Sequence, residues 1–267
     1  MCATCGCGHT AATFLEAALL RKPPPPGRRI DIEANVLARN AAIAQRNRAW
    51  LNARGIVALN LMSSPGSGKT TLLEQTLLDL RRERAIAVIE GDQETALDAE
   101  RIRATGCAAL QINTGTGCHL EAAMIANALE SLAPPRNSLL FIENVGNLVC
   151  PALFDLGETA KVVMMSVTEG DDKPLKYPHM FRAATVVLLN KIDLLPYVPF
   201  DLGRFMENVR HLNAGARVLT LSALNGQGMA AWHDWVRSQL AVAAADRYTK
   251  RTPATLSARL APNPSVE

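Results

Sequence analysis

The sequence predicts an α/β fold in which helices flank a mostly parallel central sheet. Short apolar runs typical of buried strands, such as residues 56–62 and 85–89, alternate with segments whose apolar residues recur at helical spacing, such as 72–80. This alternation is typical of βαβ units and therefore of parallel sheets. The chain has 267 residues, of which 48% are hydrophobic, and this suffices for one large domain with extensions.

A glycine-rich loop separates the first apolar run from the first of these helices. Residues 63–71 read SSPGSGKTT. Its glycines let backbone N–H groups point at an anion. The N-terminus of the following helix, the positive end of the helix dipole, also attracts the anion. The loop matches the P-loop pattern G-x-x-x-x-G-K-[ST], except that Ser63 replaces the first glycine. The strand–loop–helix context favours a P-loop NTPase over a Gly/Ser turn with a chance lysine. The predicted nucleotide-binding residues here are Gly66, Ser67, Gly68, Lys69, Thr70 and Thr71.

Cysteines cluster at the N-terminus. Cys2, Cys5 and Cys7 place three thiols within six residues, and thiolates suit nickel, zinc and copper(I). His9 or the N-terminal amine is the local candidate for a fourth ligand. The alternative is a mobile tail with reactive thiols. The proline run that follows favours an extended spacer, so we expect a flexible metal-binding arm, followed by a helix over residues 30–54 that packs outside the sheet.

Acidic residues follow two of the predicted strands. The strand at 85–89 ends at Glu90-Gly-Asp92, and the strand at 139–142 ends at Glu143. Since these strand ends lie beside the P-loop, we expect Asp92 and Glu143, with the Thr70 hydroxyl, to hold magnesium, and the N–H of Gly146 to meet a γ-phosphate. The expected catalytic residues are Lys69, Thr70, Asp92 and Glu143.

A second group of metal-binding side chains is predicted on two loops near the phosphates. Cys118 and His119 open a helix predicted at 120–132, after a strand at 108–112, and Cys150 lies four residues beyond Gly146. Both loops leave the same edge of a parallel sheet, so these side chains can meet. Thiolates with an imidazole suit zinc or nickel. Alone, the Cys118–His119 pair would more often be structural. Cys107 lies among small residues and is expected to be buried.

The second half of the chain carries a base-recognition motif. After strands predicted at 161–168 and 184–189 comes Asn190-Lys191-Ile-Asp193, the N-K-x-D pattern. A carboxylate at Asp193 accepts from guanine N1–H and the 2-amino group, which adenine lacks in that arrangement, so we expect GTP rather than ATP. Backbone N–H groups at Ser222 and Ala223, after a strand at 218–221, are expected to meet the 6-oxo group. The cluster at 169–176 either contacts a partner, orders the metal loop, or is a solvated loop.

Composition narrows the class of partner. Aromatics make up 4% of the chain, which is too few for platforms on which bases stack, and the net charge of +3 is spread along the chain. We therefore do not expect a nucleic-acid partner. No apolar run has membrane-spanning length and no signal peptide is evident, so we expect a cytoplasmic protein without a membrane partner. We predict three regions: an arm and linker at 1–29, a GTPase domain at 30–246 with a last helix over 229–244, and a disordered tail at 247–267.

These motifs together resemble one family, the hydrogenase nickel-incorporation GTPases of the HypB type. The shared segments are C-x-x-C-G-C at 2–7, the P-loop, G-D-Q at 91–93, G-C-H at 117–119, E-N-V-G-N-L-V-C-P at 143–151 and N-K-I-D at 190–193. The resemblance implies a GTP-dependent homodimer that receives nickel from an accessory protein and helps insert it into the large subunit of [NiFe] hydrogenase. It also implies a high-affinity nickel site at the N-terminal cysteines and a weaker nickel or zinc site at Cys118, His119 and Cys150, at the dimer interface.

The sequence also bears on nickel storage, on the rate of GTP hydrolysis and on alternative functions. The chain has five histidines and no histidine run, so nickel storage is not expected. No arginine finger or catalytic glutamine is evident, which predicts slow intrinsic GTP hydrolysis. The alternatives are a passive nickel- or zinc-binding protein with a vestigial nucleotide site, and a GTPase chaperone for another metalloenzyme. Urease remains possible for the latter, whereas the cysteine-rich N-terminus argues against a cobalamin-dependent mutase.

Overall fold

The computed structural model describes residues 26–92 and 97–251, with side chains for 34–92 and 98–247. Its centre is a seven-stranded sheet in the order β3-β2-β4-β1-β5-β6-β7, and every pairing is parallel. The strands are β1 (Val57–Ser63), β2 (Ile86–Asp92), β3 (Ala108–Asn113), β4 (Leu139–Glu143), β5 (Ala160–Ser166), β6 (Val186–Asn190) and β7 (Arg217–Thr220). The predicted α/β class and parallel sheet are confirmed.

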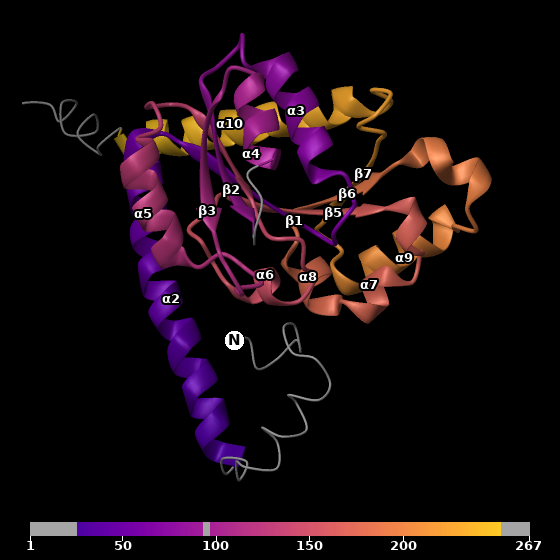
Figure 1. The fold of residues 1–267 in the computed structure, drawn as a ribbon, viewed down its shortest axis with the longest axis horizontal. Coiled ribbons are helices and arrows are strands. Elements are labelled where there is room, and N and C mark those ends of the chain that lie inside the picture. Colours follow the sequence, from indigo (N-terminus) through magenta and orange to yellow (C-terminus); the bar gives the residue numbers. More distant parts are fainter. Residues whose placement is uncertain (1–25, 93–96, 252–267) are drawn as a thin grey trace, which may run out of the picture.

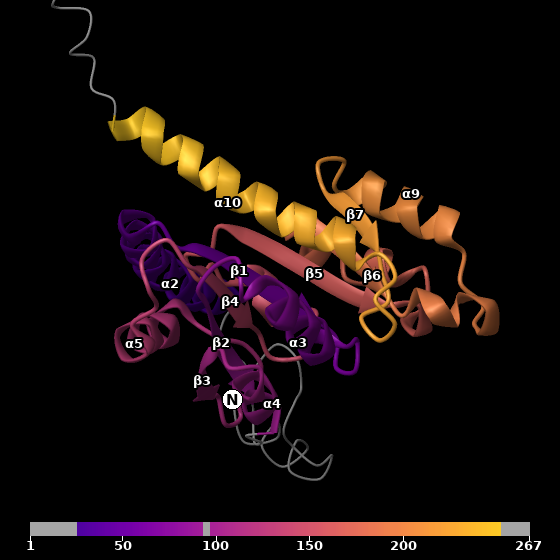
Figure 2. The ribbon, with the colours of Figure 1, turned by 90° about the horizontal axis from the view of Figure 1, so that it is seen from above.

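Helices cover both faces of this sheet (Figures 1 and 2). Alternate β1 residues point to opposite faces, so Leu59 packs with the helices on one face and Ala58 with those on the other. The first face carries α3 (Lys69–Leu80), α4 (Leu97–Ala104) and α10 (Met229–Arg251). The opposite face carries α2 (Pro26–Arg54), α5 (Ala122–Leu132), α8 (Pro178–Ala183) and α9 (Leu202–Leu212). Shorter elements are α6 (Cys150–Leu153), α7 (Lys173–Lys176), η1 (Val167–Glu169) and η2 (Ile192–Tyr197).

Both long helices extend beyond their predicted bounds. Helix α2 begins at Pro26, inside the segment expected to be an extended linker, because proline is tolerated in the first turn of a helix. Helix α10 continues through Arg251 rather than ending at Ala244, so the first residues of the expected disordered tail are helical. The segment AVAAAD has high helix propensity, and Leu240 and Ala243 pack against the core.

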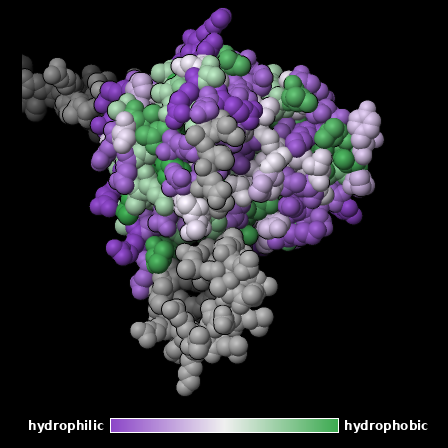
Figure 3. Space-filling model, in the orientation of Figure 1, coloured by the Kyte–Doolittle hydropathy of each residue, from purple (hydrophilic) through white to green (hydrophobic). Residues whose placement is uncertain are grey.

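Helix α9 was not among the elements predicted from the sequence, although its N-cap and its buried residues define it clearly. Asp201 caps its N-terminus by accepting the Arg204 N–H at 2.9 Å, and only Phe205 and Val209 of this helix are buried. Phe205, Met206, Val209 and Leu212 recur at helical spacing and pack on the core, so the signal was present in the sequence. The face of the molecule in Figure 3 is mainly hydrophilic, with separate hydrophobic patches. No helix of the described residues has the length and apolar character needed to cross a membrane.

Candidate functional site: a phosphate cradle beside a thiol–imidazole cluster

The P-loop joins β1 to α3 at the carboxyl edge of the sheet. Gly68 has φ +98°, and a Cβ there would lie 2.6 Å from Asn190 Nδ2, so both conformation and space require glycine. Ser63 Oγ lies inside the loop, where it accepts hydrogen bonds from Lys69 Nζ at 2.9 Å and Ser67 Oγ at 2.7 Å. The residue that departs from the P-loop pattern therefore positions the lysine.

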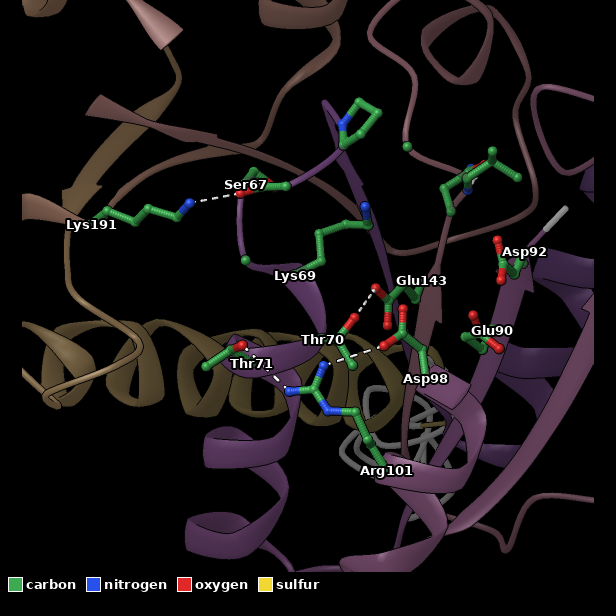
Figure 4. Close-up of a pocket in the computed structure, with 17 residues that line it drawn as sticks. Ser67, Lys69, Thr70, Thr71, Glu90, Asp92, Asp98, Arg101, Glu143 and Lys191 are labelled. Atoms are coloured by element: carbon green, nitrogen blue, oxygen red, sulfur yellow. Dashed lines mark hydrogen bonds and ion pairs between the residues drawn. The ribbon is translucent and has the colours of Figure 1, made fainter. Parts of the chain in front are cut away.

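A cavity of about 560 Å³ opens in front of this loop (Figure 4). Thr70 Oγ1 donates to Glu143 Oε1 at 3.0 Å, and Asp92, at the end of β2, also lines the cavity. The structure thus brings together the residues that the sequence named for magnesium. Two further carboxylates line the same cavity, Glu90 from β2 and Asp98 from α4. The sequence shows Glu90 two residues before Asp92, but it does not predict that Glu90 lies opposite Glu143 on the neighbouring strand.

The two glutamates face each other across neighbouring strands. Glu90 pairs with Glu143 in the register of β2 and β4. Burial, and then the charge of Glu143, raise the pKa of Glu90 to about 8. Burial also raises the pKa of Glu143, against the opposing effects of Lys69 and Thr70. Among the described residues, the Oε2 atoms of both glutamates are buried without a hydrogen-bond partner. Because ionising these two carboxyls without a partner is costly, a divalent cation would stabilise their charged forms, and the residues fit such a cation.

An arginine also lines this cavity. Arg101, on α4, pairs with Glu74 at 2.5 Å and with Asp98 at 3.3 Å, and its Nη2 lies 3.5 Å from Thr71 Oγ1 (Figure 4). The sequence had no signal for this residue, since it lies within a helix away from any motif. Its carboxylate partners hold it beside the P-loop helix.

The three side chains of the second predicted metal site lie together in the structure. Cys118 Sγ lies 3.2 Å from Cys150 Sγ and 3.6 Å from His119 Nδ1, and one ligand atom from each residue falls within 4.8 Å of the others. Both thiols are buried. Cys107 is buried elsewhere, as expected. Thiolates and an imidazole at this spacing fit a thiophilic metal ion such as nickel or zinc.

The surroundings of His119 select which ring nitrogen faces the thiols. Its ring stacks on Phe154 with centroids 4.0 Å apart, Nδ1 points toward Cys118, and Nε2 lies 3.7 Å from Glu121 Oε1. Burial lowers the pKa of His119, although Glu121 opposes this. The neutral imidazole that a metal requires is therefore favoured near neutral pH.

The segment from Glu143 to Cys150 connects the two sites. Asn144 Oδ1 accepts the backbone N–H of Leu120 at 3.2 Å, and Asn147 Nδ2 donates to the carbonyl of Cys118 at 3.3 Å. Between them, Gly146 lies so close to the P-loop that a Cβ would be 3.1–3.2 Å from Pro65. One short segment thus contacts the phosphate loop at Gly146 and the metal loop at both asparagines.

The N-K-x-D loop is braced against the P-loop. Asn190 Nδ2 donates to Ser67 O at 2.8 Å, and Lys191 Nζ donates to Gly66 O at 2.8 Å. Asn190 Oδ1 accepts the Ala223 N–H at 3.0 Å, while the Ser222 N–H donates to Gln227 O at 2.8 Å.

These bonds bear on the expected contacts with the base. In this structure the N–H groups of Ser222 and Ala223 donate to protein acceptors, and their contact with a 6-oxo group, which would have to share or replace these bonds, stays a prediction. Asp193 Oδ1, in contrast, is buried without a hydrogen-bond partner among the described residues.

The acidic segment after β5 is not a solvated loop. Glu169 accepts from the Ser64 hydroxyl and from the Ser166 N–H, which ties it to the P-loop. Asp171 is buried and pairs with Arg204 at 2.5 Å. The predicted N-terminal metal ligands, Cys2, Cys5, Cys7 and the candidate His9, lie outside the described residues, as does Gln93.

Comparison with known proteins identifies the family. The domain described as "CobW/HypB/UreG, nucleotide-binding domain" matches residues 57–220. The hydrogenase maturation factor HypB of Escherichia coli (strain K12) is 56% identical over 212 residues, which are 79% of this chain and 73% of that protein. The chain belongs to the HypB family. A second relative, the hydrogenase/urease maturation factor HypB of Helicobacter hepaticus, is 43% identical over 79% of this chain and 88% of its own.

Solved structures of HypB proteins share this fold. HypB from Archaeoglobus fulgidus has a TM-score of 0.72 at 41% identity, covering 76% of this chain and 99% of that one. HypB from Helicobacter pylori, solved in complex with nickel, has a TM-score of 0.71 at 38% identity, covering 76% and 95%. The predicted P-loop NTPase fold and the resemblance to the HypB family are therefore confirmed.

Proposed function

We propose that this HypB-family chain is a GTP-hydrolysing metallochaperone, which binds nickel and assists its insertion into the large subunit of [NiFe] hydrogenase. The observation that carries the proposal is the segment from Glu143 to Cys150. It contacts the P-loop at Gly146, holds the metal loop through Asn144 and Asn147, and supplies a thiol to the cluster. A change at the γ-phosphate would therefore reach the metal ligands directly.

Each nucleotide-site residue has a proposed role. Lys69 binds the β- and γ-phosphates, and Thr70, Asp92 and Glu143 hold magnesium, which when bound neutralises phosphate charge. The buried, unpartnered Asp193 Oδ1 supports guanine, whose N1–H and 2-amino groups would satisfy it. Hydrolysis is expected to be slow without a partner, because Arg101 is held by Glu74 and Asp98.

The cluster of Cys118, His119 and Cys150 is proposed to bind nickel or zinc, with nickel as cargo. Three protein ligands leave a position for exchange with a donor or acceptor. We further propose that GTP binding promotes a homodimer through this region, that an accessory protein delivers nickel, and that these events occur in the cytoplasm. The name of the Helicobacter pylori structure, a nickel complex of a relative, supports nickel as the metal.

The decisive experiment measures nickel affinity in two nucleotide states. Full-length protein is titrated with nickel in the presence of GDP or of a non-hydrolysable GTP analogue, with magnesium. We expect the two affinities to differ, and Cys150→Ser to abolish the difference while Cys107→Ser retains it. Equal affinities in both states would favour a passive metal-binding protein with a vestigial nucleotide site.

A second experiment separates hydrogenase from urease as the recipient. The hydrogenase/urease name of the Helicobacter hepaticus relative makes urease the specific alternative. We expect deletion of the gene, in a host with both enzymes, to abolish hydrogenase activity and leave urease activity, with excess nickel restoring part of the loss. Loss of urease activity alone would contradict the proposed recipient.

A further inference from the structure

A second cavity, of about 760 Å³, lies at the opposite edge of the sheet from the phosphate cradle. Its walls are the end of α2, the loop before β4, the loop before β5 and the C-terminal half of α10. The C-terminal half of α10 lies near the end of α2 in this region (Figures 1 and 2). Because β1, β4 and β5 begin here, the cavity is at their amino ends and is separate from the site described above.

Positive charge predominates in this cavity. Arg48, Arg54, Arg136 and Arg247 line it together with two acidic residues, Glu158 and Asp246. Arg48 is neutralised by Asp155 at 2.6 Å, and Glu158 by Lys161 at 3.7 Å. Arg54, Arg136 and Arg247 make no ion pair with the described side chains. Cations therefore outnumber anions around the cavity.

Two of these three arginines are held by neutral groups, and the third lies close to the end of α2. The Arg54 guanidinium lies over the Trp50 ring, 3.8 Å from its centroid, and Arg136 Nη2 donates to the carbonyl of Ala53 at 2.8 Å. Arg247, on α10, reaches the end of α2, where its Cζ would be 3.1 Å from a Cβ on Gly55. A guanidinium has five N–H donors, so each of these contacts leaves most donors available.

We propose that this basic cavity binds a small anion that carries two or more carboxylate or phosphate charges. Its volume is within the range of small-molecule sites, and arginines recognise both anions through paired N–H donors. Three positioned guanidinium groups on separate segments match a multivalent anion better than a single charge. The anion would connect α10 to the end of α2.

The test is calorimetric titration of the full chain with two probes, inorganic pyrophosphate and tricarballylate, in Lys69→Ala protein as well as wild type. The Lys69 change weakens the phosphate cradle, so binding that survives it belongs elsewhere. We expect Arg247→Gln to weaken binding about tenfold or more, while Arg210→Gln, which removes the same charge from the exposed face of α9, changes it less than about twofold.

The two probes distinguish the ligand class, since tighter pyrophosphate binding indicates phosphates and tighter tricarballylate binding indicates carboxylates. Arg136→Gln also removes a helix-end hydrogen bond, so its thermal midpoint is measured, and Arg247→Gln remains decisive if that variant unfolds. Absence of binding by both probes at millimolar concentration, or equal effects of Arg247→Gln and Arg210→Gln, would overturn the proposal.

Discussion

Replacing Glu90 by glutamine should change how the stability of the metal-free protein depends on pH. Glu90 is buried opposite Glu143, and its pKa is raised to about 8 from an ordinary value of 4.5. The native state therefore retains a proton that the unfolded chain has already released. Since the native state binds more protons over this interval, the free energy of unfolding falls as pH rises from about 4.5 to about 8.

The size of the effect follows from the two pKa values. Integrating the difference in bound protons gives a loss attributable to Glu90 of roughly 2.5 kcal/mol between about pH 5 and pH 7. Glutamine has a similar shape and carries no charge at either pH. The Glu90→Gln variant should therefore lack this part of the slope and be more stable than wild type near pH 7.

The assay is urea unfolding of nucleotide-free protein in EDTA, followed by circular dichroism at several pH values. Glu207→Gln, on the exposed face of α9, is the matched control and should retain the wild-type slope. Buried carboxyls that do not interact with Glu90 contribute equally to all three proteins, so the difference reports on Glu90 together with its neighbour Glu143. Parallel wild-type and Glu90→Gln curves between pH 5 and pH 7 would refute the reasoning.

Three further substitutions test single contacts. Gly146→Ala should reduce affinity for a GTP analogue by about 1–3 kcal/mol, because its Cβ crowds the P-loop; fluorescence titration showing unchanged affinity would contradict this. Trp232→Phe removes a buried 2.9 Å hydrogen bond to Thr76 and should lower the free energy of unfolding by about 1–3 kcal/mol in urea. Gly228→Ala should cost more than about 1 kcal/mol by the same measurement, since φ is +76° and the Cβ would meet Thr220 O; an unchanged midpoint would rule that out.

Much of the candidate site could be predicted because its residues follow strands. In a parallel sheet joined by helices, every strand ends at the same edge, so Lys69, Asp92, Glu143 and Asn190 had to converge. The closeness of Cys118, His119 and Cys150 also follows from this rule, because they lie in the loops after β3 and β4. The hydrogen bonds of the Ser222 and Ala223 N–H groups could not be predicted in the same way, because their acceptors, the Gln227 carbonyl and the Asn190 side chain, depend on loop conformation and packing rather than on strand direction.

The sequence by itself determined the parallel α/β class, the P-loop, the guanine motif and the pairing of thiols with imidazole, because all of these depend on local pattern and on strand direction. Only the tertiary structure decided which strands are neighbours. The order β3-β2-β4-β1 places Glu90 beside Glu143, and the position of α10 near the end of α2 gathers arginines from distant segments. Strand order and helix docking are decided by long-range packing, which leaves no signature at any single position.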